Sequence, residues 1–131
     1  MFAAAPARSS LAAYRQVGTG TTVDSASPHR LVSMLYEGLA ERIQTARGAL
    51  SRHDIPAKAH AIGSAVRIVE EGLSAPLNLR DGGEIAERLA SLYDYLVRRL
   101  THANLRNDDA ALAECAALVR TLRDGWDGIA P

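Results

Sequence analysis

Residues 54–76 read DIPAKAHAIGSAVRIVEEGLSAP, and their apolar positions decide the expected fold. Asp54 suits the start of a helix as its N-cap, and Pro76 cannot continue a helical hydrogen-bond ladder. Side chains spaced alternately four and three residues apart share one face of an α-helix. This spacing holds for Ile55, Ala59, Ile62, Val66, Val69 and Leu73. The stretch therefore predicts one long amphipathic helix that ends at about residue 75.

Three further segments have the same periodicity, and each begins with a residue that suits a helix start. The first predicted helix covers residues 27–52, with Ser27 as its N-cap and a proline at its first position, where no backbone N–H is needed. The third covers residues 81–106 with Asp81 as its cap, and the fourth begins at Asn107. We expect the third helix to bury Ile85, Leu89, Leu92, Leu96, Leu100 and Ala103.

Short loops join these four segments. Helices of about 20 to 25 residues joined in this way run antiparallel to their neighbours, so the sequence predicts an all-α, up-down four-helix bundle. Residues 1–26 are rich in Ala, Ser, Gly and Thr and lack sustained periodicity, which is typical of a flexible, mobile arm. Leu11, Tyr14 and Val17 recur there at three-residue intervals, so the arm can form a short extra helix that docks on the body. We expect a flexible arm at 1–26 and a bundle domain at 27–131.

The composition restricts the class of protein. A chain of 131 residues and 14.0 kDa, with 47% apolar residues, is long enough for one domain with its own core. Fifteen basic residues balance 15 acidic ones, so the basic surface of a nucleic-acid-binding protein is missing. The single cysteine excludes an internal disulfide, and the N-terminal apolar stretch is too short for a secretory signal or a membrane span. We expect a cytoplasmic protein without nucleic-acid binding or membrane insertion.

The second and third predicted helices have more apolar surface than one interface needs. Each carries a second stripe of mostly small residues, about 100° around the helix from the main seam. Such stripes either pack against neighbouring helices or form a shallow groove for a foreign segment. Glycines inside the helices favour the same two alternatives. A glycine inside a helix lowers helix stability by about 1 kcal/mol relative to alanine, and close packing of a neighbouring helix or of a foreign segment can offset this loss. The glycines are Gly38, Gly63 and Gly72, and the two stripes are Ala61, Ala65, Ile68 and Gly72, and Ala86, Ala90, Tyr93 and Val97.

No motif supplies the reactive side chains of an enzyme. The Glu-x-x-His pair that builds metal sites in helical bundles does not occur, and Cys115 lies on an apolar seam as core filler. Arg47 and His53 match the Arg–His spacing of helical ribonucleases, but this pair spans a helix end and a loop. We predict no catalytic residue, no metal site and no cofactor. The histidines lack ligand spacing and are expected at the surface: His29, His53, His60 and His102.

Several short motifs, taken in order along the chain, resemble one known family. Tyr14, with Gln16 and Val17, is similar to a tyrosine-rich N-terminal element. The later matches are SPHRL at 27–31, LYEG at 35–38, DGGEIA at 81–86, LYDY at 92–95 and LRDGW at 122–126. Each motif is weak alone. Together, over positions 14–129, they resemble the flagellin-specific secretion chaperones of the FliS family.

The resemblance implies a bundle that holds the disordered C-terminal segment of flagellin in the cytoplasm, in a one-to-one complex. It also implies that the chaperone prevents premature polymerisation and delivers flagellin to the flagellar type III export apparatus, with an export gate protein and other flagellar regulators as further partners. We predict that Tyr14 gates the groove for this cargo. The predicted lining is Ala61, Ala65 and Ile68 with Ala86, Ala90, Tyr93 and Val97.

A second hypothesis uses the same apolar stripes differently. The chain would then be a structural or regulatory helical bundle that binds another helical partner. Exposed apolar patches tend to find partners, so the unoccupied chain is expected to be a monomer or a weak homodimer. The two hypotheses differ in whether the chain forms a complex with flagellin.

Overall fold

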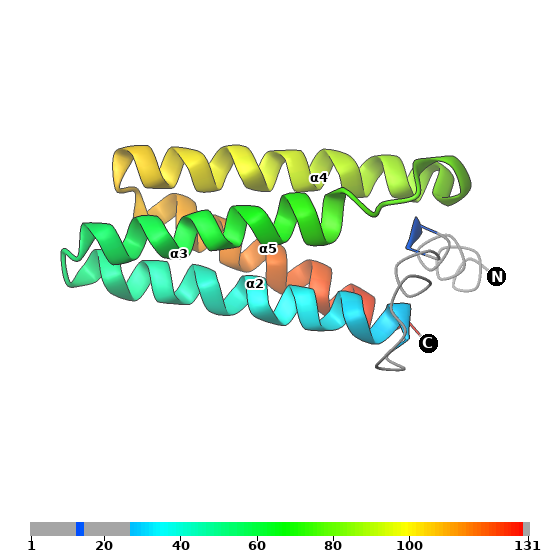
Figure 1. Ribbon diagram of the computed structural model, residues 1–131, viewed down its shortest axis with the longest axis horizontal. Helices are drawn as coiled ribbons and strands as arrows, with labels where there is room; N and C mark the ends of the chain where they lie inside the picture. Colours follow the sequence, from blue (N-terminus) through cyan, green and yellow to red (C-terminus); the bar gives the residue numbers. More distant parts are fainter. Residues whose placement is uncertain (1–12, 15–26, 130–131) are drawn as a thin grey trace.

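The computed structural model describes residues 13–14 and 27–129 (Figure 1). Long helices lie side by side along one axis and are connected at the two ends of the molecule. No strand occurs in this described part, and neighbouring helices run antiparallel, so the predicted all-α bundle is confirmed. The elements are α2 (Pro28–Ser51), α3 (Ile55–Arg67), η1 (Ile68–Ser74), α4 (Leu79–Arg106) and α5 (Asp109–Asp127).

The predicted starts of the first two helices are confirmed at the level of the capping hydrogen bond. The Ser27 hydroxyl accepts from the Arg30 N–H at 3.1 Å, and the Asp54 carboxylate accepts from the Ala57 N–H at 3.1 Å. Each bond satisfies an N–H that has no partner within its helix. The second helix continues from α3 into η1 and ends before Pro76, as its sequence predicts, but η1 is π-helical.

The predicted caps of the other two helices are wrong. Asn78, not Asp81, caps α4, and its side chain accepts from the Asp81 N–H. Gly83 then interrupts the helix at φ 59° and ψ −137°, a conformation open mainly to glycine. At the next junction Asp108 caps α5, because Asn107 takes the left-handed conformation that ends α4.

The core follows the length of the bundle, and its composition corrects one predicted seam. Leu96, Leu100 and Ala103 of α4 are buried as predicted. The N-terminal half of the same seam is only half-buried, at Ile85, Leu89 and Leu92. There the helix turns its smaller stripe inward instead, with Ala86 and Tyr93 fully buried. The reason is a second segment of chain, Ala13–Tyr14, that packs against that stripe.

Lys58 is a buried charge at the opposite end of the bundle. Its ammonium group donates to the Asn104 backbone oxygen at 2.8 Å and to the Asn107 side-chain oxygen at 2.5 Å. Both oxygens lie at the C-terminus of α4, where carbonyl groups lack helical partners and positive charge is favourable. Lys58 therefore connects α3 to the junction between α4 and α5.

Most of the predicted arm, residues 1–12 and 15–26, lies outside the described residues, so its mobility stays a prediction. Cys115 is buried on α5, as predicted, and burial raises the pKa of its thiol to about 11. In the part of the chain that the structure describes, no helix is both long enough and apolar enough to span a bilayer.

Candidate partner-binding site

Tyr14 is inserted into one end of the bundle, beside the connection from η1 to α4 (Figure 1, dark blue). Its side chain is 0% exposed. The ring meets Trp126 of α5 edge-on, with centroids 5.7 Å apart and planes at 89°. Leu73, Tyr93 and Trp126, with Gly82, surround the dipeptide Ala13–Tyr14. We call this set of four residues the tyrosine seat.

Hydroxyl groups from three elements form a chain inside the bundle. The Tyr14 oxygen lies 2.7 Å from the Leu73 carbonyl oxygen and 2.6 Å from the Tyr93 hydroxyl, which lies 2.6 Å from the Tyr36 hydroxyl. A carbonyl only accepts, and a hydroxyl has one proton. Tyr14 therefore donates to Leu73, Tyr93 donates to Tyr14, and Tyr36 donates to Tyr93. The chain links α2, α4 and η1 through Tyr14.

The backbone of the dipeptide is held as closely as its side chain. The Asn78 N–H donates to the Ala13 carbonyl at 2.6 Å. A Cβ at Gly82 would lie 2.9 Å from the Ala13 Cα, closer than real Cβ contacts, and 2.6 Å from the Ala86 Cβ. Glycine at position 82 thus allows the dipeptide to lie directly on the first turn of α4.

Burial raises the pKa of all three clustered tyrosines well above the usual value. Desolvation is the largest cause at Tyr14, Tyr36 and Tyr93, and the electrostatic effect of a neighbouring tyrosine adds to it in each case. The three side chains are therefore neutral hydrogen-bonding groups at physiological pH. They position one another and supply no acid or base.

His29 and Trp126 fix the outer wall of the seat. The rings stack with centroids 5.3 Å apart, the indole N–H donates to the His29 carbonyl at 2.9 Å, and the imidazole Nε2 lies 3.0 Å from the Trp126 carbonyl. His29 is half-buried, so the prediction that it is a plain surface residue is wrong. Its neighbour in the fold, a tryptophan nearly a hundred positions away, is not visible in local sequence.

The two small-residue stripes contact different parts of the molecule. On the second helix, Ile68 meets Gly38 of α2 and Gly72 meets Leu35, with a Cβ built at Gly72 3.0 Å from a Leu35 methyl carbon. Gly72 therefore allows close packing of the second helix on α2, whereas a Cβ at Gly38 would make an ordinary contact with Ile68, at 3.7 Å. The α4 stripe instead faces the seat and η1 through Tyr93. The stripes do not line one shared channel in this structure.

Burial divides the predicted lining residues into two groups. Three are half-buried and reach the surface: Ile68, Ala90 and Val97. The others are at most 3% exposed: Tyr14, Ala61, Ala65, Ala86 and Tyr93. Contact between a partner and the second group requires a segment of the chain to move. Their role in partner binding stays a prediction.

An apolar cleft of about 300 Å³ runs between α4 and α5, and sequence reasoning missed it. Tyr36 and Trp126 line it and also belong to the seat or its hydroxyl chain, so the two features are continuous. The sequence pattern predicts that Ile85, Leu89 and Leu92 are buried in the core, whereas they are half-buried along the cleft. Its large apolar side chains are Ile85, Leu89, Leu92, Leu122 and Ile129.

Comparison with known proteins decides the family. The family model described as flagellar protein FliS matches residues 10–131. The flagellar secretion chaperone FliS of Salmonella typhimurium is 43% identical over 123 residues, 94% of this chain and 91% of that protein. FliSB of Pseudomonas aeruginosa, a protein of the same description, is 44% identical over 116 residues, 88% of this chain and 91% of the relative. The chain belongs to the FliS family.

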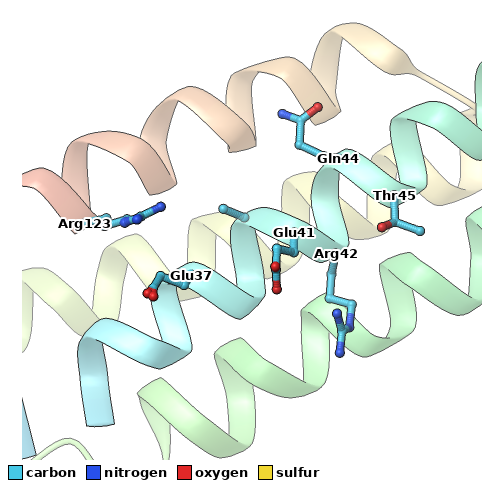
Figure 2. A pocket seen from close by; sticks show the side chains of 7 residues that line it. Glu37, Glu41, Arg42, Gln44, Thr45 and Arg123 are labelled. Atoms are coloured by element: carbon cyan, nitrogen blue, oxygen red, sulfur yellow. The ribbon is translucent and has the colours of Figure 1, made fainter. Parts of the chain in front are cut away.

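FliS proteins are named as chaperones and not as enzymes, and the remaining surface of this FliS chain fits that class. A depression of about 640 Å³ lies between α2 and α5 (Figure 2). Glu37 and Glu41 project into it beside Arg42 and Arg123, so its charges are mixed. Arg42 also donates to Ser64 at 3.1 Å, which fixes it to α3. The depression holds no nucleophile with an adjacent base.

The Arg–His pair that resembles helical ribonucleases has no catalytic arrangement in this FliS chain. The Arg47 guanidinium donates twice to the Asp109 carboxylate, at 2.9 and 3.0 Å. This contact holds the pKa of Asp109 below its usual value. Arg47 is thereby occupied in joining α2 to α5, while His53 is exposed in the turn before α3. Within the described ranges, no group of acidic, histidine or cysteine side chains could hold a metal ion.

Proposed function

We propose that this chain is a cytoplasmic export chaperone that binds the disordered C-terminal segment of flagellin in a one-to-one complex. Binding prevents premature polymerisation and delivers flagellin to the flagellar type III export apparatus. Membership of a family whose members are named flagellar secretion chaperones supports this proposal. The structural observation that carries it is the tyrosine seat, an apolar site beside an open cleft, filled by a short piece of the chain's own N-terminal region.

The mechanism begins with displacement of Tyr14. The dipeptide Ala13–Tyr14 covers apolar surface and buried hydrogen-bonding groups, and flagellin takes its place. An amphipathic segment lays its apolar face into a groove, and the cost of ordering that segment lowers the affinity enough for later release. The occupied seat therefore protects flagellin without fixing its final fold.

The lining residues contribute in order of accessibility. Ala90 and Val97 are half-buried on α4, so they and the side chains of the α4–α5 cleft are accessible to the incoming segment first. Ala86 and Tyr93 come into contact once Tyr14 has left. Ala61 and Ala65 are at most 3% exposed, so they contact flagellin only after a segment of the chain moves, whereas Ile68 beside Gly38 of α2 is half-buried and reaches the surface.

Isothermal titration of the full chain with a peptide covering the C-terminal helices of flagellin from the same organism tests the proposal. We expect a one-to-one complex with a negative heat-capacity change, because apolar surface is buried while the peptide folds. If correctly folded protein gives neither heat nor complex, the bundle serves a different helical partner and the proposal is wrong.

The gating role of Tyr14 has its own test in the Gly82→Ala variant. The added Cβ collides with Ala13 as well as with Ala86 of α4, so it loosens the dipeptide without changing any tyrosine, and unchanged helical circular dichroism checks that α4 persists. Because the arm then competes less, the flagellin peptide should bind more tightly than to the wild-type chain. Gly63→Ala is the matched control, since its added Cβ meets only the far end of Arg67, at 3.9 Å, and Gly63 lies outside the seat and the cleft. Equal affinity of both variants and the wild type would contradict the gating role.

Ala90→Arg tests the α4 lining. Ala90 is half-buried, so an arginine there can extend into solvent and obstruct the bound segment while the helix persists. We expect loss of flagellin binding with unchanged helical circular dichroism. Ala65→Asp is unsuitable for this purpose, because Ala65 is 0% exposed and a carboxylate there would unfold the core.

A further inference from the structure

The last turn of η1 leaves one carbonyl without a donor from its own helix. The N–H groups that could reach the Leu73 oxygen belong to the next few residues. Pro76 has none, the Leu77 N–H donates to Ser74 at 3.1 Å, and the Asn78 N–H donates to Ala13 at 2.6 Å. The Leu73 carbonyl therefore depends on a group from outside the helix.

The Tyr14 hydroxyl is that group, and it also completes the buried hydroxyl chain. It donates to Leu73 and accepts from Tyr93, which in turn accepts from Tyr36. No buried side-chain nitrogen or oxygen in the described part of the chain lacks a partner. Removal of Tyr14 leaves both the Leu73 carbonyl and the Tyr93 hydroxyl facing apolar surroundings.

A purely apolar occupant would leave the Leu73 carbonyl without a donor and one hydrogen of the Tyr36–Tyr93 pair without an acceptor, which opposes its binding. Polar groups buried without partners are costly, whereas one hydroxyl in that position can donate to Leu73 and accept from Tyr93. We propose that the tyrosine seat selects a segment that places a hydrogen-bond donor that can also accept, a hydroxyl, where the Tyr14 hydroxyl lies. This inference rests on the proposed function, since the flagellin segment that displaces Tyr14 is the occupant.

The first experiment measures the donor requirement with the chain's own arm as the probe. The full-length Tyr14→Ala variant, checked for native helicity, is titrated with a peptide of residues 8–20 and with the same peptide carrying the change Tyr14→Phe. Trp126 fluorescence reports binding, because Tyr14 contacts that ring. We expect the phenylalanine peptide to bind at least ~5-fold more weakly, since it lacks only the hydroxyl. Equal affinities, or no binding of either peptide, would overturn the inference.

The second experiment measures whether flagellin meets the same requirement. The flagellin peptide is titrated into the Tyr14→Ala variant with and without the additional change Tyr93→Phe. A segment that hydrogen-bonds this hydroxyl should lose about 5-fold or more in affinity, whereas an apolar segment should bind the Tyr93→Phe chain equally well or better. Tyr95→Phe is the matched control, because it removes a hydroxyl of α4 that donates to Glu114 and lies outside both the seat and the cleft.

The outcomes separate the two proposals. Flagellin binding that ignores Tyr93→Phe and does not displace the arm peptide overturns the donor requirement and leaves the chaperone function standing. Absence of flagellin binding to folded variants overturns the chaperone function. If flagellin does not bind but the two arm peptides still differ in affinity, the seat has the proposed hydrogen-bond requirement and flagellin is not its partner.

Discussion

Four hydrogen-bonding groups in the tyrosine seat and its hydroxyl chain come from residues 14, 36, 73 and 93. Each group is buried, and each is satisfied only by the others. Such a network ties the position of one residue in the N-terminal region to the packing of three helices. Two consequences at the scale of single residues can be measured.

The first is a loss of stability at alkaline pH. Burial raises the pKa of Tyr14, Tyr36 and Tyr93 above the unfolded value of about 10, so the folded state favours the protonated form. The stability that this provides is complete below pH 10 and is lost as pH rises above it. Urea unfolding between pH 8 and 11.5 should show this fall, and Tyr93→Phe should make it less steep. Phenolate absorbance from these residues at pH 10 without any loss of stability would contradict the prediction.

The second concerns Lys58, which is 3% exposed. Replacing it with methionine keeps a similar length but removes the donors to Asn104 and Asn107. We expect the free energy of unfolding to fall by about 1 to 3 kcal/mol, because buried acceptors lose their partner. Arg67→Met is the matched control on the same helix, since Arg67 is exposed and should change stability by less than about 0.5 kcal/mol. Similar values for both variants would show that the buried contacts of Lys58 are not important.

At the scale of elements, glycines inside the helices have two roles: some permit close contact between two helices and others do not. Gly72 meets Leu35 across the interface between the second helix and α2, whereas nothing but the far end of Arg67 lies near Gly63. A helix interior glycine that permits no contact only lowers helix stability. The loss of helix stability that the sequence predicts for a glycine is therefore offset by packing at Gly72 and is not offset at Gly63.

Substitution should separate these two roles. Gly63→Ala is expected to raise the free energy of unfolding by about 1 kcal/mol through helix propensity alone. Gly72→Val should lower it, because a branched side chain must displace Leu35, whose methyl carbon lies 3.0 Å from the position of a Cβ. Denaturant unfolding monitored by circular dichroism measures both. A stabilising Gly72→Val variant would exclude close packing as the reason for this glycine.

At the scale of the whole molecule, the two ends of the bundle differ. One end is closed by short turns and by Lys58. The other collects the tyrosine seat, the His29–Trp126 pair, the kink at Gly83 and the apolar cleft. Figure 1 places the start of α2 and the end of α5 at that same end. Local opening there can expose a binding surface while the remainder of the core stays packed.

Hydrogen exchange should detect this difference. The Asn78 amide is bonded to Ala13 and not to a helix, so its protection depends on docking of the dipeptide. Tyr14→Ala should speed exchange at Asn78 about tenfold or more, with little change at Leu39 or Ile43 in the middle of α2. Uniform acceleration over all helices would indicate global destabilisation and would contradict local opening.

The sequence alone determined the number, order and direction of the helices, because 3.6-residue periodicity and capping residues are local signals. It also pointed to Tyr14, through a resemblance confined to short motifs. It did not determine which stripe of α4 faces inward. Ile85 and Leu89 are larger and more hydrophobic than Ala86, so the sequence pattern predicts that they, and not Ala86, face the core. The tertiary structure reversed that order because a distant dipeptide fills the space beside Ala86 and Tyr93.

The seat itself depends on contacts that no local pattern contains. Tyr14 is separated by 59 positions from Leu73 and by 79 positions from Tyr93, the two residues it bonds. Only the folded chain brings the free carbonyl of η1 to the one hydroxyl that satisfies it. Helices form from interactions within a few residues, whereas a buried polar site forms only where packing excludes water and brings together polar groups from distant parts of the chain.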